Sequence, residues 1–416
     1  MVTLKNVCIV GLGYMGLPTA LLLADAGYKV VGFDVVKSKV DLLNDDKLPF
    51  DETGLEELFK RSKHNFKAVH ELNKQITSDI DCYIVCVPTP FTKKNTCDLT
   101  FVNSAMESIV PFMKKNVLVV LESTVSPGTT KGVVKNILEK SGLIAGKDFY
   151  LSYVSEKAIP GNTLYEMKHN ARIIGGINAE SADMTKKIYS SFVKGETFLT
   201  DTMTAETTKL VENTFRDINI AYANELAKIC EKLGIDVWEV IALASKHPRV
   251  KILSPGPGVG GHCIAIDPWF IIEQQPSALI SLARHINDSM PEYVFDKLHT
   301  IIESKHIHHP KITILGVAYK KNVDDDRETP ANEIIRLCLA SHWNVKIHDP
   351  FVRDFHYPLT RDFNEAIKDS DVIVIVTDHD YYHDVDLSKH VVLDTRGMNI
   401  KAKEYHVLGN GKRESV

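Results

Sequence analysis

The chain has 416 residues, of which 44% are hydrophobic and 25% are charged, and its formal net charge is −5. This length allows two or three domains with substantial cores. The slightly acidic balance argues against nucleic acid as the main partner, so anionic ligands would have to be bound by local arginines and lysines. No apolar run approaches the roughly 18 residues of a membrane span. We expect no signal peptide, because the N-terminus leads directly into a strand and a glycine-rich turn.

The seven cysteines are odd in number and scattered along the chain. Cys8, Cys82 and Cys86 lie in strand-like apolar runs, where cysteine is usually a small buried hydrophobe. Cys82 and Cys86 have no second pair that would complete a metal site, so we expect no bound metal. The cysteine pattern predicts a reducing, cytoplasmic location.

Residues 5–34 have the pattern of a strand, a glycine turn, a helix and a second strand. Further strand signals occur at Asp81–Val87, Val117–Glu122 and Phe149–Val154, with helical stretches between them. This alternation predicts a parallel sheet with helices on both faces.

The first turn has the sequence GLGYMG and follows an apolar strand. In this context Gly11 makes the tight turn, Gly13 lets the backbone approach a pyrophosphate, and Gly16 permits close helix–strand packing. Asp34 ends the next strand, where a carboxylate would bind the adenosine ribose hydroxyls and repel a 2′-phosphate. The turn therefore predicts a site for NAD rather than NADP.

Two more loops follow strands of this first domain, CVPTP at Cys86–Pro90 and ESTVSPGTT at Glu122–Thr130. Ligands of α/β proteins bind outside the carboxyl ends of the strands. Thr89 and Thr124 are therefore candidates for cofactor or substrate contact, although threonine and proline are also ordinary turn residues.

A long helical pattern runs from about Thr204 to Leu233, followed by more helix to about Ser245. An apolar stripe recurs at helical spacing at Val211, Phe215, Ile218, Tyr222, Leu226 and Ile229. A separate polar stripe contains Glu206, Lys209, Asn213 and Asp217. The pattern predicts a central connector helix and a dimer interface. Lys209 and Asn213 are neighbours on one face, and Arg216 follows, so this face is either solvated or part of a site.

The segment PGPGVGGHCIAIDPWF at Pro255–Phe270 carries Cys263 just after three glycines, Gly258, Gly260 and Gly261. Glycines allow such a turn to approach a ligand closely. The alternative is a buried structural cysteine. A thiolate that attacks an aldehyde forms a thiohemiacetal, which can lose a second hydride to become a thioester that water hydrolyses. A free thiol has a pKa of about 8.5, so the thiolate needs a cation nearby, such as Lys209.

From Lys311 the alternation restarts, with strand signals in KITILGVAYK, NVKIHDP, VIVIVTDH and VVLDTRG and a helix across Ala331–Ser341. Gly316 follows the first of these strands, but the other two fingerprint glycines are missing. We therefore predict a nucleotide or nucleotide-sugar site in this second doubly wound unit. The preceding His-rich stretch, Lys305–Pro310, is interpreted as a solvated linker rather than a metal site.

The expected fold class is α/β, with two doubly wound Rossmann-like domains joined by a central helical domain with a long connector helix. Residues 1–200 would form the NAD-binding domain. Residues 201–300 would form the central domain, with the cysteine loop and the dimer contact. Residues 301–416 would bind the nucleotide sugar.

These segments together resemble the UDP-glucose/GDP-mannose dehydrogenase family over essentially the whole chain. The matching motifs are GLGYMGLP, Asp34, CVPTP, STVSPGTT, the AExxKLxxN helix, GPGVGGHCIAIDP and GVAYKKNVDDDRETPA. The resemblance implies oxidation of a nucleotide-sugar alcohol at C6 to the carboxylate, with two NAD and no release of aldehyde. The cysteine segment looks like that of the branch with N-acetylated substrates. UDP-N-acetyl-D-mannosamine is the expected substrate, with UDP-N-acetyl-D-glucosamine as the alternative.

The resemblance also implies roles for individual residues. Cys263 would be the nucleophile, Lys209 and Asn213 would stabilise the oxyanion, and Asp267 would position Lys209 or water. Thr124 would orient a water, and Glu156 would be the base for thioester hydrolysis. NAD would be bound by the glycine turn and by Tyr14, Met15, Asp34, Thr89, Thr124 and Arg327. The UDP-sugar would be bound by Lys157, Ala158, Lys209, Asn213, Arg216, His247, Arg249, Gly260, Tyr319 and Lys320, in part across a dimer interface.

One stretch departs from the family pattern. Where the family usually has Pro-Glu-Arg, this chain has Ser155-Glu156-Lys157. The carboxylate is retained, but lysine does not reproduce a bidentate arginine contact.

Two other functions share part of this sequence pattern. A two-electron hydroxyacid dehydrogenase would share the Rossmann start and the helical connector, but it has no use for the cysteine loop or the third domain. A nucleotide-sugar-binding regulator without catalysis would not need the catalytic residue types, all of which are present.

Overall fold

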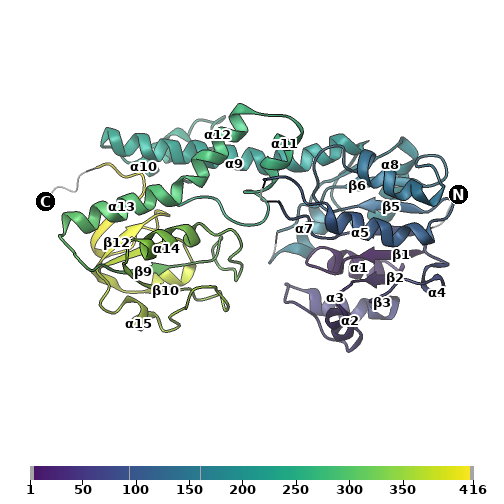
Figure 1. Cartoon of the computed structure of the whole chain (residues 1–416), viewed down its shortest axis with the longest axis horizontal. Coiled ribbons are helices and arrows are strands. Elements are labelled where there is room, and N and C mark those ends of the chain that lie inside the picture. Colours follow the sequence, from purple (N-terminus) through teal and green to yellow (C-terminus); the bar gives the residue numbers. More distant parts are fainter. Residues whose placement is uncertain (1–3, 93, 160, 413–416) are drawn as a thin grey trace. The chain divides into compact units, whose positions relative to one another are not determined.

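The structure, a computed structural model, describes residues 4–92, 94–159 and 161–412. The chain divides into two compact units. The first extends to Val211 and includes Trp269–Gln275, and the second comprises Glu212–Pro268 and the chain from Pro276 onward. We describe each unit by itself (Figure 1). No helix of the described residues is long and apolar enough to cross a membrane.

Among the described residues, the first unit has one eight-stranded sheet with the order β3-β2-β1-β4-β5-β6-β7-β8. The strands are β1 (Asn6–Val10), β2 (Lys29–Phe33), β3 (Phe66–Val69), β4 (Cys82–Val85), β5 (Leu118–Leu121), β6 (Tyr150–Val154), β7 (Arg172–Gly176) and β8 (Thr197–Asp201). The strands expected near the N-terminus and in the three later runs are present. The order reverses between β1 and β4, the switch point at which ligands bind in doubly wound sheets.

The sheet is not wholly parallel, which corrects the expectation from the sequence. β7 pairs antiparallel with β6, and β8 runs parallel to β7. Both strands, and β3, were missed because they lack a long apolar run. β7 ends in Gly175 and Gly176, and two of the five residues of β8, Phe198 and Leu199, are apolar and exposed. A Cβ at Gly176 would lie 2.3 Å from the Asn178 carbonyl oxygen, so this glycine permits close packing of the following helix.

Helices cover both faces of this sheet, as predicted. In β1, Val7 and Ile9 pack with α1 (Gly16–Asp25), α3 (Leu55–Ser62) and α8 (Ala179–Tyr189). Cys8 and Val10 point to the other face and pack with α5 (Thr100–Ile109) and α6 (Lys135–Leu138). This is the alternation of a strand buried on both sides. Cys8 and Cys82 are fully buried, as expected for small hydrophobes.

The smaller helices of the first unit lie in the connections. They are α2 (Lys37–Asn44), α4 (Lys74–Thr77) and α7 (Thr163–His169).

The connector helix is α9, Thr202–Leu233, which confirms the long helix predicted from the sequence. Gly234 follows it with a φ of 71°, and α10 (Val237–Ala244) forms a separate helix rather than a continuation. On α9 the apolar stripe contains exposed side chains and the polar stripe contains buried ones, the opposite of an ordinary surface helix. Phe215 is 64% exposed and Tyr222 53%, whereas Asn213 is 1% exposed. Glu206 and Asp217 of the polar stripe are also buried, and Lys209 is half-buried. Asn224, further along the same helix, is buried as well.

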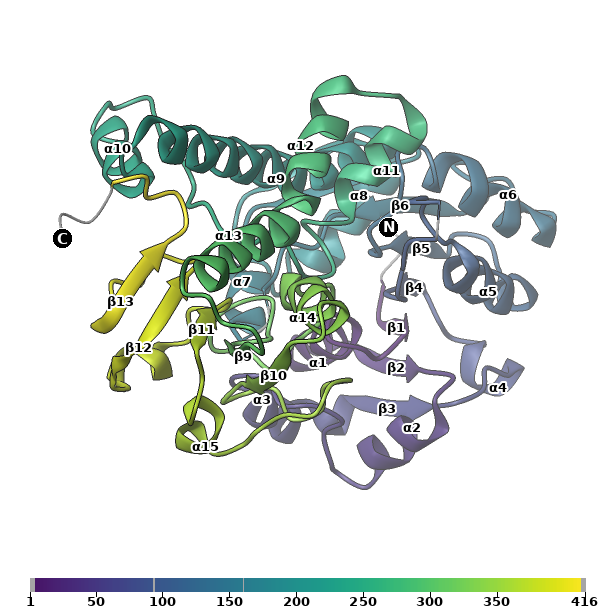
Figure 2. The same ribbon diagram turned by 60° about the vertical axis from the view of Figure 1, so that its left-hand side comes forward.

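The second unit has a five-stranded sheet within its described residues, in the order β10-β9-β11-β12-β13 (Figure 2). The strands are β9 (Lys311–Leu315), β10 (Asn344–His348), β11 (Val372–Ile375), β12 (Leu387–Asp394) and β13 (Ala402–Val407). All four pairings are parallel. The second doubly wound unit is thus confirmed. β13 was missed because its residues are only half-buried.

On one face of this sheet lie α13 (Met290–Ser304) and α14 (Pro330–Ala340), and on the other lies α15 (Phe363–Ile367). The remaining helices are α11 (Asp267–Gln274), which spans the division between the units, and α12 (Ala278–Asp288). The single glycine of the fingerprint, Gly316, has a φ of 86°, and a Cβ there would lie 2.5 Å from that of Thr377. His306, His308 and His309 are exposed, which fits a linker.

Candidate active site

The glycine turn of the first unit has no room for side chains at two of its three fingerprint positions. Gly11 has a φ of 94°, and a Cβ there would lie 2.7 Å from the Cys86 carbonyl oxygen. A Cβ at Gly16 would lie 1.8 Å from the Gly11 carbonyl oxygen. A Cβ at Gly13 would meet no protein atom within 4 Å, so the space beside this backbone is open. These features fit a turn that receives a dinucleotide pyrophosphate at the start of α1.

Asp34 is 7% exposed and organises the mouth of this turn. Its two carboxylate oxygens accept hydrogen bonds from the backbone N–H groups of Leu12 and Val36, both at 2.9 Å. The Lys39 ammonium is 2.7 Å from Asp34 Oδ2. Asp34 was predicted from the sequence, but Lys39 was not. The feature that could have indicated it is a lysine in the first turn of the helix that follows Asp34. Tyr14 is 54% exposed, and its ring lies 4.3 Å from that of Phe50.

The loop after β5 is fixed by a buried carboxylate from α9. Glu206 accepts hydrogen bonds from Gly128 N at 2.6 Å and Thr130 N at 2.7 Å. Glu206 was assigned only to a polar stripe in the sequence, but it is fully buried. Thr124, in the same loop, is half-buried, and Thr89, in the loop after β4, is 6% exposed. Both threonines thus lie at the carboxyl ends of neighbouring strands, as expected.

A buried carboxyl, Glu122, lies beneath these loops. Cys86 donates its thiol to Glu122 Oε2 over 3.0 Å. Burial, and then the nearby carboxylate of Glu156, raise the pKa of Glu122 to about 7, an effect that Arg172 partly offsets. Burial, and then the carboxyl group of Glu122, also raise the pKa of the Cys86 thiol. Glu122 carries no sequence signal beyond its place in a loop motif.

Glu156 is 8% exposed, and both of its carboxylate oxygens have partners. Oε2 forms an ion pair with Arg172 at 2.6 Å, and Oε1 accepts from the backbone N–H groups of Lys157 and Ala158, each at 2.6 Å. Arg172 is 1% exposed and also donates to the Met167 carbonyl oxygen. A hydrolytic base would have to give up at least one of these bonds, so the role of Glu156 stays a prediction. The sequence missed Arg172 because it opens a strand that was not identified.

In the second unit, Asn213 and Asp267 lie together. Asn213 Nδ2 donates to Asp267 Oδ2 over 2.5 Å, and Asn213 Oδ1 accepts from the guanidinium of Arg216. Asp267 is 3% exposed. Lys209 belongs to the first unit, so its predicted pairing with Asp267 or with a thiolate stays a prediction. The polar face of α9 is therefore organised and buried around Asn213, whereas Lys209 is half-buried and Arg216 is exposed.

Cys263 is exposed on the glycine-rich segment, which rules out a buried structural cysteine. Gly258 has a φ of 131° and Gly261 a φ of 82°. A Cβ at Gly261 would lie 2.8 Å from the ring of Tyr319, and one at Gly260 would lie 2.6 Å from the Glu328 carbonyl oxygen. The glycines therefore let the cysteine segment pack directly against the loop after β9.

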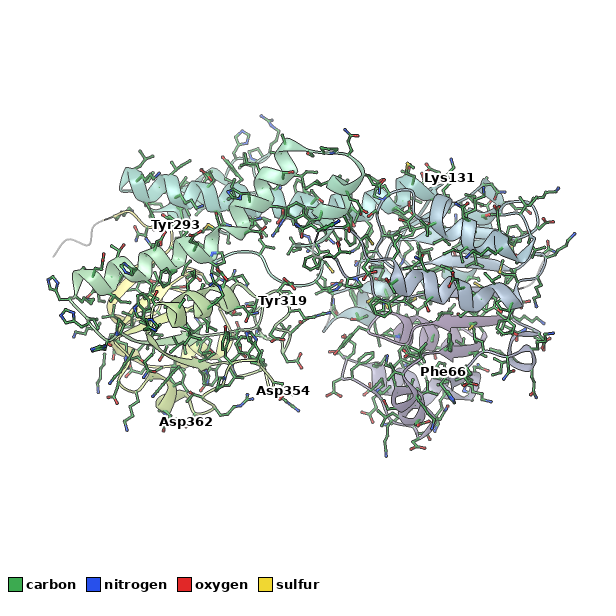
Figure 3. All side chains as sticks on the ribbon, viewed as in Figure 1. Phe66, Lys131, Tyr293, Tyr319, Asp354 and Asp362 are labelled. Atoms are coloured by element: carbon green, nitrogen blue, oxygen red, sulfur yellow. The ribbon has the colours of Figure 1, made fainter. Side chains whose placement is uncertain are left out.

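The same loop carries Tyr319 and Lys320, which are expected to bind the nucleotide sugar, and Arg327, which is expected to reach NAD. Gly261 N donates to the Arg327 carbonyl oxygen over 3.0 Å. The Arg327 side chain is bound to Asp325, with Nε and Nη2 at 2.9 and 2.6 Å from its carboxylate oxygens. Tyr319, labelled in Figure 3, is half-buried, and Lys320 is exposed. The structure thus brings Cys263, Gly260, Tyr319 and Arg327 to neighbouring segments.

A second buried aspartate shapes this loop, in the way that Asp34 shapes the first turn. Asp349 follows β10 and accepts from the N–H groups of Val317 and Ala318 at 2.7 and 3.1 Å. Although burial raises it, the hydrogen bond and charge of His379 bring the pKa of Asp349 down to about 2. His379 Nδ1 accepts from Asn322 N, so Nε2 donates to Asp349 over 3.0 Å. The sequence missed both residues, although Asp349 occupies the position of Asp34 in the second Rossmann-like unit.

Comparison with known proteins covers almost the whole chain. Three models of the UDP-glucose/GDP-mannose dehydrogenase family match it: the NAD binding domain at residues 5–193, the central domain at 203–289 and the UDP binding domain at 313–400. The chain belongs to the UDP-glucose/GDP-mannose dehydrogenase family. It is accordingly an NAD-dependent dehydrogenase with a UDP-binding domain.

Individual relatives share the full length. A UDP-N-acetyl-D-mannosamine dehydrogenase of Methanococcus maripaludis is 44% identical over 430 residues, covering 98% of each chain. A solved UDP-D-ManNAc dehydrogenase from Pyrococcus horikoshii is 35% identical, with a TM-score of 0.92 over 98% of this chain and 100% of that one. The UDP-N-acetyl-mannosamine dehydrogenase Cap5O from S. aureus is 39% identical, with a TM-score of 0.88 over 98% and 99%.

Two of the expected substrate residues of this dehydrogenase lie outside these contacts. His247 and Arg249 are exposed after α10, and Arg249 N donates to His247 Nδ1 over 3.3 Å. Their expected role across a dimer interface stays a prediction.

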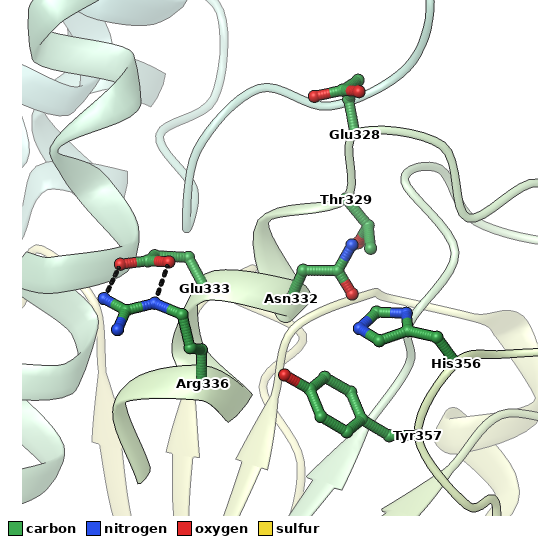
Figure 4. A pocket seen from close by; sticks show the side chains of 7 residues that line it. All are labelled: Glu328, Thr329, Asn332, Glu333, Arg336, His356 and Tyr357. Atoms are coloured by element: carbon green, nitrogen blue, oxygen red, sulfur yellow. Dashed lines mark hydrogen bonds and ion pairs between the residues drawn. The ribbon is translucent and has the colours of Figure 1, made fainter. Parts of the chain in front are cut away.

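A pocket of about 350 Å³ opens beside the start of α14 (Figure 4). It is lined by Glu328, Thr329, Asn332, Glu333, Arg336, His356 and Tyr357. Glu333 and Arg336 form a bidentate ion pair at this pocket, with Arg336 Nε and Nη2 at 2.7 and 2.6 Å from the carboxylate oxygens of Glu333. None of the predicted site residues is among these lining residues, although Glu328 and Thr329 directly follow Arg327 in the sequence.

Proposed function

We propose that this family member oxidises UDP-N-acetyl-D-mannosamine at C6 to UDP-N-acetyl-D-mannosaminuronate. The observation that carries the chemistry is an exposed Cys263 on a glycine-rich segment tied to Asn213, Tyr319 and Arg327 in one unit. The observation that favours this substrate is the full-length similarity to relatives that bear its name. UDP-N-acetyl-D-glucosamine, which differs in configuration at C2, is the competing substrate.

The reaction balances as a four-electron oxidation. One alcohol, two NAD⁺ and one water give one carboxylate, two NADH and three protons. NAD bound at the glycine turn would supply the hydride acceptor for each of the two oxidations at C6. The residues that would hold it are Gly11, Gly13, Asp34 and Lys39. Gly13 leaves an open backbone surface for the pyrophosphate, and Asp34, paired with Lys39, offers a carboxylate to the ribose hydroxyls.

The second oxidation uses the thiol. The Cys263 thiolate forms a C–S bond with the aldehyde carbon, while the carbonyl oxygen gains a proton and becomes the thiohemiacetal hydroxyl. Oxidation of this adduct releases that proton and leaves a thioester. The amide of Asn213, fixed by Asp267, is the nearby donor in the second unit that would stabilise the developing oxyanion, with Lys209 as its expected partner.

Hydrolysis completes the reaction. Water breaks the C–S bond, the sugar leaves as a carboxylate, and the thiol is regenerated. Glu156 would remove the water proton once one of its present partners is released, and Thr124 would orient the water. Arg172 would hold the Glu156 carboxyl group in place in the resting site.

We also propose a homodimer that buries the exposed apolar stripe of α9. Val211, Phe215, Tyr222 and Ile229 are between 44% and 64% exposed on one side of this helix. An apolar stripe of this kind on a long helix fits a second copy of the same surface. The predicted cytoplasmic location stays a prediction.

Competition between the two sugars tests the proposed substrate. Purified enzyme is assayed with NAD and with either UDP-N-acetyl-D-mannosamine or UDP-N-acetyl-D-glucosamine, and kcat/KM is compared. We expect kcat/KM to be at least about tenfold higher for the manno substrate, which corresponds to about 1.4 kcal/mol. A preference for the gluco substrate would assign the alternative specificity. Tight UDP-sugar binding without NADH formation from either sugar would instead assign a non-catalytic regulator.

A further inference from the structure

The cysteine segment is attached to α9 at two points, one on each side of Cys263. Ahead of the cysteine, Gly256 N donates to Asn224 Oδ1 over 2.9 Å. Behind it, Asp267 accepts from Asn213 over 2.5 Å. Asn213 and Asn224 are eleven residues apart, which is close to three turns and roughly 16 Å of helix. The two side chains therefore lie on the same face of one rigid element.

The forward attachment is part of a buried polar chain. Asn224 Nδ2 donates to Asn287 Oδ1 over 2.9 Å, and Asn287 Nδ2 donates to Asp217 Oδ1 over 2.8 Å. Arg284 donates to the same Asp217 oxygen over 2.5 Å. All four side chains are 2% exposed or less. The chain thus links α9 and α12 to the backbone of the cysteine segment.

The carboxylate of Asp217 fixes the direction of this chain. An ionised carboxylate only accepts, so Asn287 must present its amide nitrogen to Asp217 and its oxygen to Asn224. Asn224 must then present its own nitrogen to Asn287, which leaves its oxygen for Gly256 N–H. Each amide therefore has one orientation that satisfies all of these hydrogen bonds, and the backbone at Gly256 is held in one position.

The segment needs such an attachment because its own backbone is permissive. Gly258 and Gly261 have φ values in the region that only glycine enters freely, and glycine loses more conformational entropy on ordering than other residues. The thiol must nevertheless be held within a fraction of an ångström of its reaction geometry. A segment fixed only at Asp267 would leave Cys263 with more freedom on its N-terminal side.

We propose that Asn224 is a positioning residue for the second oxidation, acting through Gly256 on Cys263. This inference rests on the proposed function. The first oxidation does not use the thiol, whereas capture of the aldehyde does. Loss of the Asn224–Gly256 bond should therefore slow aldehyde capture selectively and let aldehyde escape.

The test measures how the product divides between acid and aldehyde. Asn224→Ala, the wild type and Asn344→Ala are incubated with limiting UDP-N-acetyl-D-mannosamine, NAD and hydroxylamine, which traps free aldehyde as an oxime. Asn344 is an exposed asparagine of the same unit at the start of β10, so it controls for the change of residue type. We expect two NADH per sugar and no oxime for the wild type and for Asn344→Ala. For Asn224→Ala we expect a ratio clearly below two, with oxime accounting for the deficit.

A merely structural role gives a different result. If Asn224→Ala lowers the melting temperature or kcat but keeps two NADH per sugar and forms no oxime, the proposal is wrong. Asn224→Asp guards against poor folding, because it is isosteric and keeps an acceptor for Gly256 while it loses the donor to Asn287. Because the bond to Gly256 is kept, the ratio should stay closer to two than in Asn224→Ala, and a ratio as low as that of Asn224→Ala would count against the proposal. A wild type that itself gives one NADH or none would refute the proposed function instead.

Discussion

Asn213 donates its side-chain amide to Asp267, and both side chains are almost fully buried. The pair joins α9 to the start of α11, within the cysteine segment. Because a carboxylate accepts and never donates, Asp267 keeps the amide nitrogen of Asn213 on its side and leaves the amide oxygen for Arg216. This relationship fixes the donor that the proposed mechanism assigns to the oxyanion.

Removal of this partner should therefore lower activity. Asp267→Ala leaves a buried amide without its acceptor, and a hydrogen bond to a charged group contributes about 1.5–3 kcal/mol. We expect kcat to fall by about 10- to 100-fold, the rate equivalent of that energy. The double variant Asp267→Ala with Asn213→Ala should lose little more than the worse single variant, because the two residues act as a unit. Additive losses in steady-state kcat would show that they act separately.

Replacement of the nucleophile should stop acid formation. Cys263→Ser substitutes a hydroxyl, which is far less ionised than a thiol at neutral pH, so aldehyde capture should become negligible. We expect no uronate by mass spectrometry of the product. Cys97→Ser, at a half-buried cysteine of the first unit, serves as the matched control and should leave uronate formation intact. Normal uronate yield from Cys263→Ser is the result that would refute the covalent mechanism.

Glu122 should make stability depend on pH. Its folded pKa of about 7 lies above the ordinary value of 4.5, so the folded state binds the proton more tightly. The resulting stabilisation is fully present below about pH 4.5 and is lost as pH rises through about 7. Thr19, Cys86, Glu156, Arg172 and Tyr189 face this carboxyl from the surrounding elements.

Glu122→Gln keeps the neutral form at every pH. The difference in unfolding free energy between the variant and the wild type should therefore change by about 1–3 kcal/mol in favour of the variant between pH 4.5 and 8. Urea unfolding across this range, followed by circular dichroism, measures it. A difference that does not vary with pH would mean that Glu122 is ionised throughout.

Asp34 should determine the choice of cofactor. Asp34→Asn removes the negative charge that Lys39 neutralises and that would repel a 2′-phosphate. We expect KM for NAD to rise by about tenfold, equivalent to about 1.4 kcal/mol, and the preference for NAD over NADP to narrow. Asp41→Asn, at the exposed partner of Lys37 on the same helix α2, is the control. An unchanged ratio of kcat/KM for NAD and NADP would contradict this assignment.

The apolar stripe of α9 should hold the dimer together. Phe215→Glu places a charge at the centre of that stripe, so we expect sedimentation equilibrium to give the monomer mass of 46.6 kDa. Phe101→Glu, at a phenylalanine of α5 that is 50% exposed, should leave the dimer intact. If Phe215→Glu remains dimeric, the interface lies elsewhere.

Much of the fold followed from local pattern. The glycine turn has its own motif, and the helix α9 has stripes at helical spacing. An apolar run marks each of the strands β1, β2, β4, β5 and β6. The strands that were missed, β3, β7, β8 and β13, are short or partly exposed, and their strand pairing rather than their own sequence defines them. The antiparallel pairing of β6 with β7 is likewise a property of tertiary packing.

The site divides in the same way. Cys263, Asp34 and Asn213 stand in motifs whose spacing indicates chemistry. Lys39, Arg172 and Asn224 were missed because an isolated lysine, arginine or asparagine carries no signal until the fold gives it a partner. Their importance becomes visible only in the contacts with Asp34, Glu156 and Gly256.

The number of NADH molecules formed per UDP-N-acetyl-D-mannosamine consumed tests the central claim most directly. Absorbance at the end of a reaction with limiting sugar and excess NAD gives this ratio. The proposed cysteine mechanism predicts two, with uronate as the only sugar product. A ratio of one, with aldehyde as the product, would contradict the roles of Cys263 and Glu156.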